Sequence, residues 1–267
     1  MIKLVICDMD GTLLNDDKKL PVQFDSVVSQ LKDVGIKFGI GSGRQFQSLS
    51  SLFEKHAKDF VFISDNGTFV YDGHTLVASN TMSESDTKVV IERLSPYDVP
   101  LIMSGQEGAH QLYFEDSKIN EELAHYYSKK IEHDSYDEVN DLIGKVAVLD
   151  FSESLPIADL FDDMNDVTIV RSGPIWWDVM STTVNKGESL KQYMAYHDIK
   201  PSEVIVFGDY MNDYEMLSVV DYSFAMENAV TEIKEIANFM APSNNDEGVM
   251  KVLNDLLDGT FEDKWKL

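Results

Sequence analysis

Two carboxylates near the start of the chain have the type and spacing of a catalytic pair. Asp8 and Asp10 follow the apolar residues 4–7 and precede Gly11. The apolar run is typical of a buried strand in a parallel sheet, and open α/β sheets bind ligands at the carboxyl ends of their strands. One carboxylate could act as a nucleophile and the other as a proton donor, and both could hold a cation. An ordinary Asp-Gly turn would explain the same residues, so the choice between a turn and a catalytic pair depends on the other segments of the chain.

A second segment, residues 39–44, is rich in glycine and ends in Ser42-Gly43-Arg44. Backbone N–H groups at a junction between a strand and a helix bind anions well. Ser42 could donate a hydrogen bond to a phosphate oxygen, and Arg44 could add positive charge. A glycine-rich turn without a ligand is the alternative.

A third segment centres on Lys186. Asn185 and Glu188 have the spacing of a capping box, which predicts a helix over residues 187–198. Lys186 would lie in or beside the first turn of that helix, where the helix dipole disfavours a cation. A residue whose charge is unfavourable for its position in a helix indicates a function, such as holding an anion between Lys186 and the helix end. An exposed lysine is the alternative.

A fourth segment repeats the pattern of the first, because the apolar residues 204–208 are followed by Asp209, Asn212 and Asp213. These side chains offer the hard oxygen ligands that Mg²⁺ prefers. We predict that Asp209 is a metal ligand, since the first segment offers matching oxygens. Asp213 could instead cap the helix that follows.

Composition limits the class of protein. The 267 residues are 43% hydrophobic, which is enough for a sizeable core, and carry 22 basic and 47 acidic groups for a net charge of −25. This charge argues against nucleic acid or an anionic membrane as a partner. An anionic small substrate needs only a local positive site and stays compatible with it.

The single cysteine, Cys7, lies inside the first predicted strand and is expected to be a buried core residue. A disulfide within the chain and a paired-cysteine metal site are therefore excluded. The first residues lack a signal-peptide pattern, and no apolar run is long enough to span a membrane. We expect a soluble, cytoplasmic protein.

The segments that must position these groups alternate between strand-like and helix-like patterns, which predicts an α/β fold. The predicted core strands and helices are strands 2–7, 36–40, 60–64, 204–208, 222–225 and 238–241, and helices 22–34 and 46–56. Residues 83–180 have a helix–strand–strand rhythm typical of a smaller sheet. Their predicted elements are helix 84–94, strands 99–104 and 109–114, helix 118–131, strand 145–151, helix 155–164, and strands 167–172 and 175–180. We predict a core of residues 1–82 and 181–267 with an inserted domain, 83–180.

In this order the four segments resemble the motifs of the haloacid dehalogenase (HAD) superfamily, and most closely the Cof-like phosphatases of subclass IIB. Residues 8–12 match the family's DxDGT, Ser42 its second motif, Lys186 its third and residues 208–213 its fourth. Further matches to family signatures are Asn66-Gly67, Asn228-Ala229 and residues 245–249. The resemblance covers nearly the whole chain. It implies a Rossmann-like, doubly wound parallel-sheet core with an inserted α/β cap of type C2.

Two residues depart from the family pattern. Tyr210 stands where many relatives have a small residue, and Glu227 replaces a frequent glycine before Asn228. Neither change removes a catalytic group, but both could alter the mouth of the site.

The resemblance also implies a mechanism. Asp8 would attack phosphorus and form an aspartyl-phosphate, while Asp10 would act as general acid and then as general base. Mg²⁺ would be held by the Asp8 side chain, the Asp10 backbone carbonyl and Asp209. Arg44 would bind substrate, and Asp213 would orient Lys186 or a metal-bound water. The phosphate-binding groups would be the backbone amides of Met9 and Gly43 and the side chains of Ser42, Lys186 and Asn212.

The expected function is a Mg²⁺-dependent phosphatase of small phosphorylated metabolites such as sugar phosphates, acting as a monomer or weak homodimer. One alternative is a phosphomutase of the phosphomannomutase type. Such an isomerase needs a second phosphate site, and the predicted cap holds only Arg93 and Arg171. A non-catalytic metabolite-binding protein is the other alternative, against which the intact acidic and lysine motifs argue.

Overall fold

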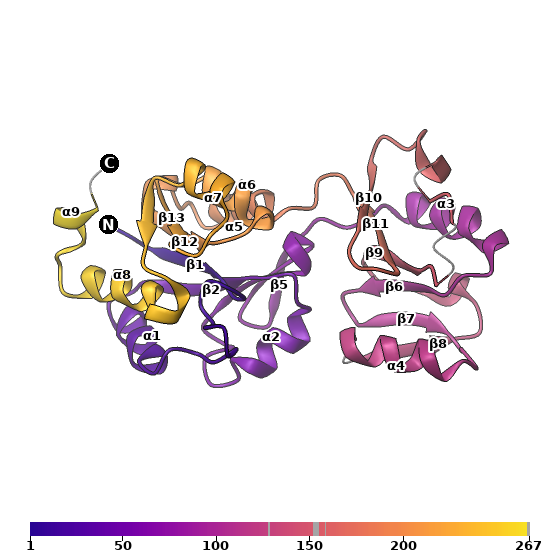
Figure 1. Ribbon diagram of the computed structural model, residues 1–267, viewed down its shortest axis with the longest axis horizontal. Coiled ribbons are helices and arrows are strands. Elements are labelled where there is room, and N and C mark those ends of the chain that lie inside the picture. The colour runs from indigo at the N-terminus through magenta and orange to yellow at the C-terminus, as the bar shows by residue number, and fades with distance from the viewer. Residues whose placement is uncertain (128, 152–154, 158, 266–267) are drawn as a thin grey trace. The chain divides into compact units, whose positions relative to one another are not determined.

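The computed structural model describes residues 1–127, 129–151, 155–157 and 159–265 (Figure 1). The chain divides into two compact units, Met1–Ser79 with Asn185–Leu267 (the core unit) and Asn80–Val184 (the inserted unit). None of the helices in these described ranges has the length and apolar composition needed to cross a bilayer.

The core unit is built on a sheet of eight strands in the order β14-β13-β12-β1-β2-β3-β4-β5. The strands are β1 (Leu4–Asp8), β2 (Lys37–Gly41), β3 (Val61–Ser64), β4 (Phe69–Asp72), β5 (Thr75–Ser79), β12 (Val204–Gly208), β13 (Tyr222–Met226) and β14 (Phe239–Ala241). Neighbours from β14 to β3 pair in parallel, so their carboxyl ends meet at one edge. The predicted doubly wound α/β fold is confirmed.

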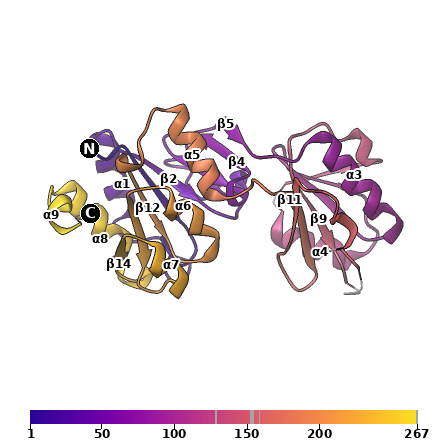
Figure 2. The same cartoon turned by 90° about the horizontal axis from the view of Figure 1, so that it is seen from above.

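The central strands are buried on both sides, as their continuous apolar sequences predict. Helices α1 (Phe24–Asp33), α2 (Phe46–Leu52) and α8 (Gly248–Leu257) cover one face of the core sheet. Helices α5 (Lys186–Tyr196), α6 (Tyr214–Ser218) and α7 (Thr231–Ile236) cover the other, and Figure 2 shows α5 and α6 lying across the strands. The short α9 (Phe261–Lys264) packs on α8. Cys7 is completely buried in β1, as predicted.

Two predicted core helices are shorter than expected. Val22 is 94% exposed and precedes α1, while Val34 is 60% exposed and follows it, so neither belongs to the buried helix face. Helix α2 ends at Leu52 rather than at residue 56. The hairpin of β4 and β5, which extends the sheet in antiparallel pairing, was not predicted.

The inserted unit has its own sheet of six strands in the order β10-β11-β9-β6-β7-β8. The elements are α3 (Glu84–Leu94), β6 (Leu101–Gly105), β7 (Ala109–Leu112), α4 (Ser117–Tyr126), β8 (Lys130–His133), β9 (Ile143–Leu149), β10 (Val167–Arg171) and β11 (Trp176–Ser181). Val90 and Leu94 of α3 join one apolar cluster, whereas Leu123 of α4 joins another. This unit therefore has a hydrophobic core separate from that of the core unit.

Two predicted helices of the inserted unit are wrong. Helix α4 ends at Tyr126, and residues 130–131 of the predicted helix 118–131 belong to β8, which pairs in parallel with β7. The half-buried Ile131 and His133 alternate with exposed neighbours, which suits an edge strand. The predicted helix 155–164 is only the 3₁₀ turn Asp159–Phe161, and its residue 158 lies outside the described residues. The backbone N–H groups of Asp159 and Leu160 bond to the carbonyls of Pro156 and Ile157, three residues earlier, which is the pattern of 3₁₀ turns rather than of an α-helix.

The other short 3₁₀ turns join these elements. In the core unit they are Asp65–Gly67, Pro201–Glu203, Met211–Asp213 and Asn244–Asp246, and in the inserted unit Ser95–Tyr97 and Tyr136–Glu138.

Candidate active site

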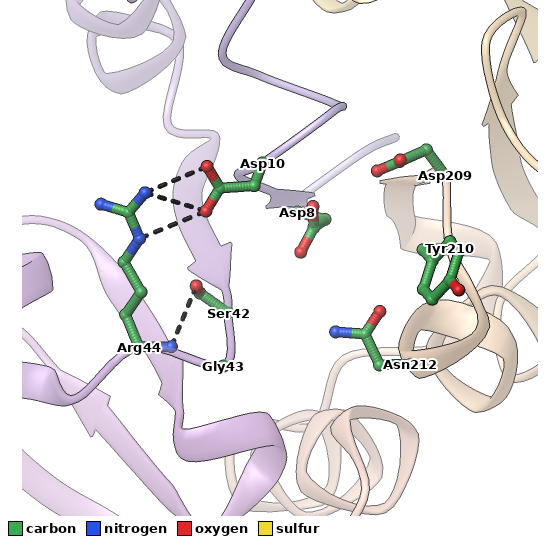
Figure 3. Close-up of a pocket in the computed structure, with 8 residues that line it drawn as sticks. All are labelled: Asp8, Asp10, Ser42, Gly43, Arg44, Asp209, Tyr210 and Asn212. Carbon is green, nitrogen blue, oxygen red and sulfur yellow. Dashed lines mark hydrogen bonds and ion pairs between the residues drawn. The ribbon is translucent and has the colours of Figure 1, made fainter. Parts of the chain in front are cut away.

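A cavity of about 380 Å³ opens at the carboxyl edge of the core sheet, where β1, β2 and β12 end. Figure 3 shows its lining residues, which are Asp8, Asp10, Ser42, Gly43, Arg44, Asp209, Tyr210 and Asn212. Three of the four sequence segments therefore meet here because their strands are neighbours in the sheet. The remaining segment, the third, contributes Lys186 from the start of α5, and this residue contacts Asp8.

Asp8 is the last residue of β1, and its side chain is only 9% exposed. The following turn passes through Gly11, whose φ of +88° is a conformation that favours glycine. A Cβ atom at Gly11 would lie 2.3 Å from Oδ2 of Asp209, so glycine is also needed for the close approach. Thr12 Oγ1 donates a hydrogen bond of 2.6 Å to Oδ1 of Asp209. The loop after β1 thus packs directly against the end of β12.

Lys186 has no exposed surface, and its Nζ donates to Oδ1 of Asp8 and to Oδ1 of Asp213, both at 2.6 Å. Asn185 caps the helix by accepting a 2.7 Å hydrogen bond from the backbone N–H of Glu188, which is one of the two bonds of the predicted capping box. Burial acts to lower the pKa of Lys186, but the two carboxylates outweigh it and raise the pKa. The cation at a helix N-terminus is therefore balanced by ion pairs rather than by solvent.

The carboxylates of Asp8, Asp209 and Asp213 offer oxygen atoms that lie within 4.8 Å of one another. Burial raises the pKa of Asp209 despite the hydrogen bond from Thr12, and the charge of Asp213 adds to this effect. Burial also raises the pKa of Asp8, although Lys186 opposes it. Such crowding of buried carboxylates fits a hard divalent cation, which would offset their repulsion.

Asp213 differs from the other two acidic residues because both of its oxygens already have protein donors. Oδ1 accepts from Lys186, while Oδ2 accepts from the backbone N–H groups of Asp209 at 3.0 Å and Tyr210 at 3.3 Å. Asp213 thus links Lys186 to the loop that carries Asp209. The side chains of Asp8 and Asp209 are consequently better placed to hold a cation than that of Asp213.

Asp10 is held by two cations. The Arg44 guanidinium forks onto its carboxylate with contacts of 2.9 to 3.2 Å, and Lys18 Nζ lies 2.9 Å from Oδ1. Partial burial acts to raise the pKa of Asp10, but Lys18 and Arg44 outweigh it and lower the pKa. Arg44, predicted to bind substrate, contacts the predicted general acid here (Figure 3). Lys18 had no sequence signal.

The remaining predicted phosphate-binding residues lie on both sides of the cavity. Ser42 Oγ accepts a 3.2 Å hydrogen bond from the backbone N–H of Arg44. Asn212 Nδ2 donates to Oδ1 of Asn66 at 3.1 Å, and a Cβ atom at Gly43 would lie equally close to the Asn66 amide. Asn66, matched in sequence only as a family signature, thus joins the two sides.

Met9 can contribute only through its backbone, because its side chain is fully buried in the core. This arrangement is compatible with the amide role that the family resemblance implies for it.

An α/β core with an inserted α/β unit, and paired aspartates after the first strand, define a class of hydrolase. Residues 5–253 match the family model of the haloacid dehalogenase-like hydrolases, and the chain belongs to this family. The resemblance noted in the sequence is confirmed.

Individual relatives cover almost the entire chain. The 5-amino-6-(5-phospho-D-ribitylamino)uracil phosphatase YbjI of Escherichia coli is 33% identical over 96% of each chain. The crystal structure of TM0651 from Thermotoga maritima has a TM-score of 0.85 and 25% identity, covering 95% of this chain and 97% of that one. The subclass IIB sugar phosphatase BT4131 shares the fold, with a TM-score of 0.72 and 19% identity over 95% of this chain and 98% of its own. The predicted enzyme class, a HAD-type phosphoric monoester hydrolase, is confirmed by the family match and the names of its relatives.

Proposed function

We propose that this protein is a Mg²⁺-dependent phosphatase that hydrolyses small phosphorylated metabolites through an aspartyl-phosphate. The observation that carries the proposal is the position of Asp8, which lies at the end of β1, lines the cavity and contacts the buried ammonium group of Lys186. A carboxylate fixed in this way can attack a phosphate without moving far, which is the main requirement of phosphoryl transfer.

In the first step an oxygen of Asp8 would attack phosphorus, and the bond from phosphorus to the leaving oxygen would break. Asp10 would give its proton to that oxygen. In the second step Asp10 would take a proton from the attacking water, whose oxygen bonds to phosphorus and frees Asp8 and inorganic phosphate. Because Arg44 and Lys18 favour ionised Asp10 in this structure, we propose that substrate binding loosens these contacts.

Bound Mg²⁺ would be held by the side chains of Asp8 and Asp209 and the backbone carbonyl of Asp10, and would supply positive charge that lets Asp8 approach an anionic phosphate. Ser42, Asn212, Lys186 and the backbone amides of Met9 and Gly43 would hold the phosphate oxygens. Asp213 would keep Lys186 in place through the contact between them.

The substrate class we propose is a sugar or sugar-alcohol phosphate. The relative that is 33% identical is named for 5-amino-6-(5-phospho-D-ribitylamino)uracil, which makes this compound the first candidate to test here. A mutase would need a second cationic phosphate site. In the inserted unit Arg93 pairs with the Asp163 carboxylate and donates to the backbone carbonyl of Leu160, while Arg171 donates to the carbonyl of Pro174. Because both arginines already bind protein oxygens, these observations favour the hydrolase over the mutase.

The test is a panel of phosphorylated metabolites assayed for phosphate release with Mg²⁺ and with a chelator. Asp8→Asn protein from the same purification serves as the control for contaminating phosphatases. We expect release from one or more sugar phosphates that needs both Mg²⁺ and Asp8. Isomerisation that depends on a bisphosphate would favour the mutase, and binding without turnover would favour a metabolite-binding protein.

A further inference from the structure

The loops that follow β13 and β14 hold the loop that follows β1 through two asparagine side chains. Asn228 Nδ2 donates a 2.7 Å hydrogen bond to the backbone carbonyl of Gly11. Its Oδ1 accepts a 3.0 Å hydrogen bond from the backbone N–H of Asn244. Asn244, only 3% exposed, donates in turn to the carbonyl of Leu14 at 3.0 Å and to Asp16 at 3.1 Å. None of these residues touches the cavity that holds Asp8.

The same loop also holds the other half of the site. The backbone N–H of Val230 donates to the carbonyl of Asp209 at 3.0 Å. Gly11 therefore contacts both Asn228 and Asp209. Its carbonyl accepts from the Asn228 amide, and its Cα lies so close to the Asp209 carboxylate that a Cβ atom would overlap it. The loop after β13 thus fixes the Asp10-Gly11-Thr12 segment and Asp209 relative to each other.

We propose that Asn228 is a positioning residue for the phosphatase reaction, with Asn244 fixing the orientation of its amide. This inference rests on the proposed function. The role requires an amide, because one side chain must donate to Gly11 and accept from Asn244 at the same time. Aspartate has the same shape but only accepts, so it cannot make the bond to Gly11.

Asn228 is exposed, so its side chain contributes little to burial in the folded core. Its loss should therefore act on local geometry more than on global stability. A displacement of about 1 Å between reacting groups costs on the order of 100-fold in rate. A purely structural role would predict the opposite balance, with loss of stability and unchanged turnover.

Asn238 provides a matched control. It is also exposed, and its Nδ2 donates to the backbone carbonyl of Asp221 at 2.8 Å. This bond joins the residues just before β13 and β14, at the amino ends of these parallel strands and thus at the opposite edge of the sheet. Asn238→Ala removes the same type of hydrogen bond far from the cavity.

The experiment compares Asn228→Ala, Asn228→Asp and Asn238→Ala with the unmodified protein. The readouts are kcat and KM for an aryl phosphate, the Mg²⁺ concentration for half-maximal activity, and the melting temperature with and without Mg²⁺. We expect both Asn228 variants to lose about 10- to 100-fold in kcat with KM changed by less than about 3-fold. Both variants should also need more Mg²⁺ for half-maximal activity and gain less thermal stability from it. Asn238→Ala should match the unmodified protein in kcat, in KM, in the Mg²⁺ requirement and in the Mg²⁺-induced rise in melting temperature.

Unchanged kcat in both Asn228 variants would overturn the proposal, as would a change confined to KM, which would place Asn228 at the substrate. If Asn228→Ala does not fold, Asn228→Asp, which retains the acceptor for Asn244, decides alone. If the unmodified protein hydrolyses no phosphate ester, the proposed function fails by itself. The Mg²⁺-induced stabilisation then still tests Asn228, and an equal gain in Asn228→Ala and Asn238→Ala would reject its positioning role.

Discussion

Lys186 allows two carboxylates to be buried near the carboxyl ends of β1 and β12, because its ammonium group contacts both Asp8 and Asp213. Removing one partner from a buried ion pair typically costs about 3–5 kcal/mol, since the remaining charges lose their compensation. Lys186→Met should therefore lower the free energy of unfolding by about this amount near neutral pH, in addition to reducing turnover.

The cost of Lys186→Met should depend on pH. Burial already raises the pKa of Asp8, and loss of the lysine would raise it further. A carboxyl group with a raised folded-state pKa favours folding below its unfolded pKa of about 4, and this contribution is lost as pH rises through the folded value. In metal-free protein the deficit measured by urea unfolding should thus be larger at pH 8 than at pH 5. An equal deficit at both values would show that the unpaired carboxylates are not its cause.

Asp8→Asn tests the covalent step, because an amide is a poor nucleophile. We expect kcat to fall by at least about 1,000-fold while the protein stays folded, because Lys186 keeps its ion pair with Asp213. Acid-quenched samples of the unmodified enzyme with ³²P-labelled substrate should contain labelled protein, and those of the variant should not. Substantial turnover by the purified variant would reject Asp8 as the nucleophile.

Asp10→Asn tests the proton transfer. Loss of a general acid typically costs 10²- to 10⁴-fold, but a good leaving group needs little protonation. We therefore expect the rate of the first step, formation of the aspartyl-phosphate, to decrease much more for alkyl phosphates than for aryl phosphates such as p-nitrophenyl phosphate. If the first step is measured by rapid quench and both substrate types lose the same factor, Asp10 does not protonate the leaving group.

At the scale of elements, the adjacency of β1 and β12 brings together the acidic residues of the proposed metal site, because Asp8 is the last residue of β1 and Asp209 directly follows β12. Chelation should abolish activity, and Mg²⁺ should restore it. Asp209→Ala should raise the Mg²⁺ concentration needed for half-maximal activity by about 10-fold or more and reduce the Mg²⁺-induced rise in melting temperature. Ser218→Ala, on the exposed side of α6, serves as the control. Unchanged metal dependence in Asp209→Ala would place the cation elsewhere.

Elements with one dominant signal were predictable from the sequence. The strands that carry the site are apolar on both faces, and the capping residues around Lys186 make its helix start explicit. The start of β8, residues 130–131, was wrongly predicted as the end of helix 118–131, because a short edge strand with one half-buried face has only a weak period. The hairpin of β4 and β5 was not predicted, because its pairing register shifts between Val70 and Tyr71 and such an irregularity has no simple sequence pattern.

The contacts between distant residues were the least predictable part of the site. The spacing of Asp8, Asp10 and Asp209 indicated their chemistry, and parallel strands explain why they meet. The fork of Arg44 onto Asp10, the contribution of Lys18 and the bridge through Asn66 depend on how loops fold over the sheet edge. Such contacts join residues without any fixed sequence separation.

At the scale of the whole molecule, the two units have separate apolar clusters, so we expect them to unfold in separable transitions. Leu31 of α1 and Leu94 of α3 are both buried leucines on helices, 0% and 1% exposed. Leu31→Ala and Leu94→Ala should each cost about 2–5 kcal/mol in their own unit. In calorimetry, Leu31→Ala should lower the midpoint temperature of the transition that Mg²⁺ shifts upward. Leu94→Ala should lower the midpoint temperature of the other transition. A single transition shifted equally by both variants would contradict this independence.

The pairing of Leu4 with Val204 also has a consequence for biosynthesis. A nascent chain that has already emerged with β1 must wait for β12, and at roughly 5–20 residues per second this delay is on the order of 10–40 s. The whole inserted unit is translated during that interval and contains the partners of all its own strands. It can fold on the ribosome while one edge of β1, a completely buried strand in the folded protein, stays unpaired. Open strand edges invite intermolecular association. The proposed catalytic residues Asp8 and Asp10 are therefore synthesised early, but they reach their place beside β12 only after this interval, during which the open edge of β1 needs protection from association.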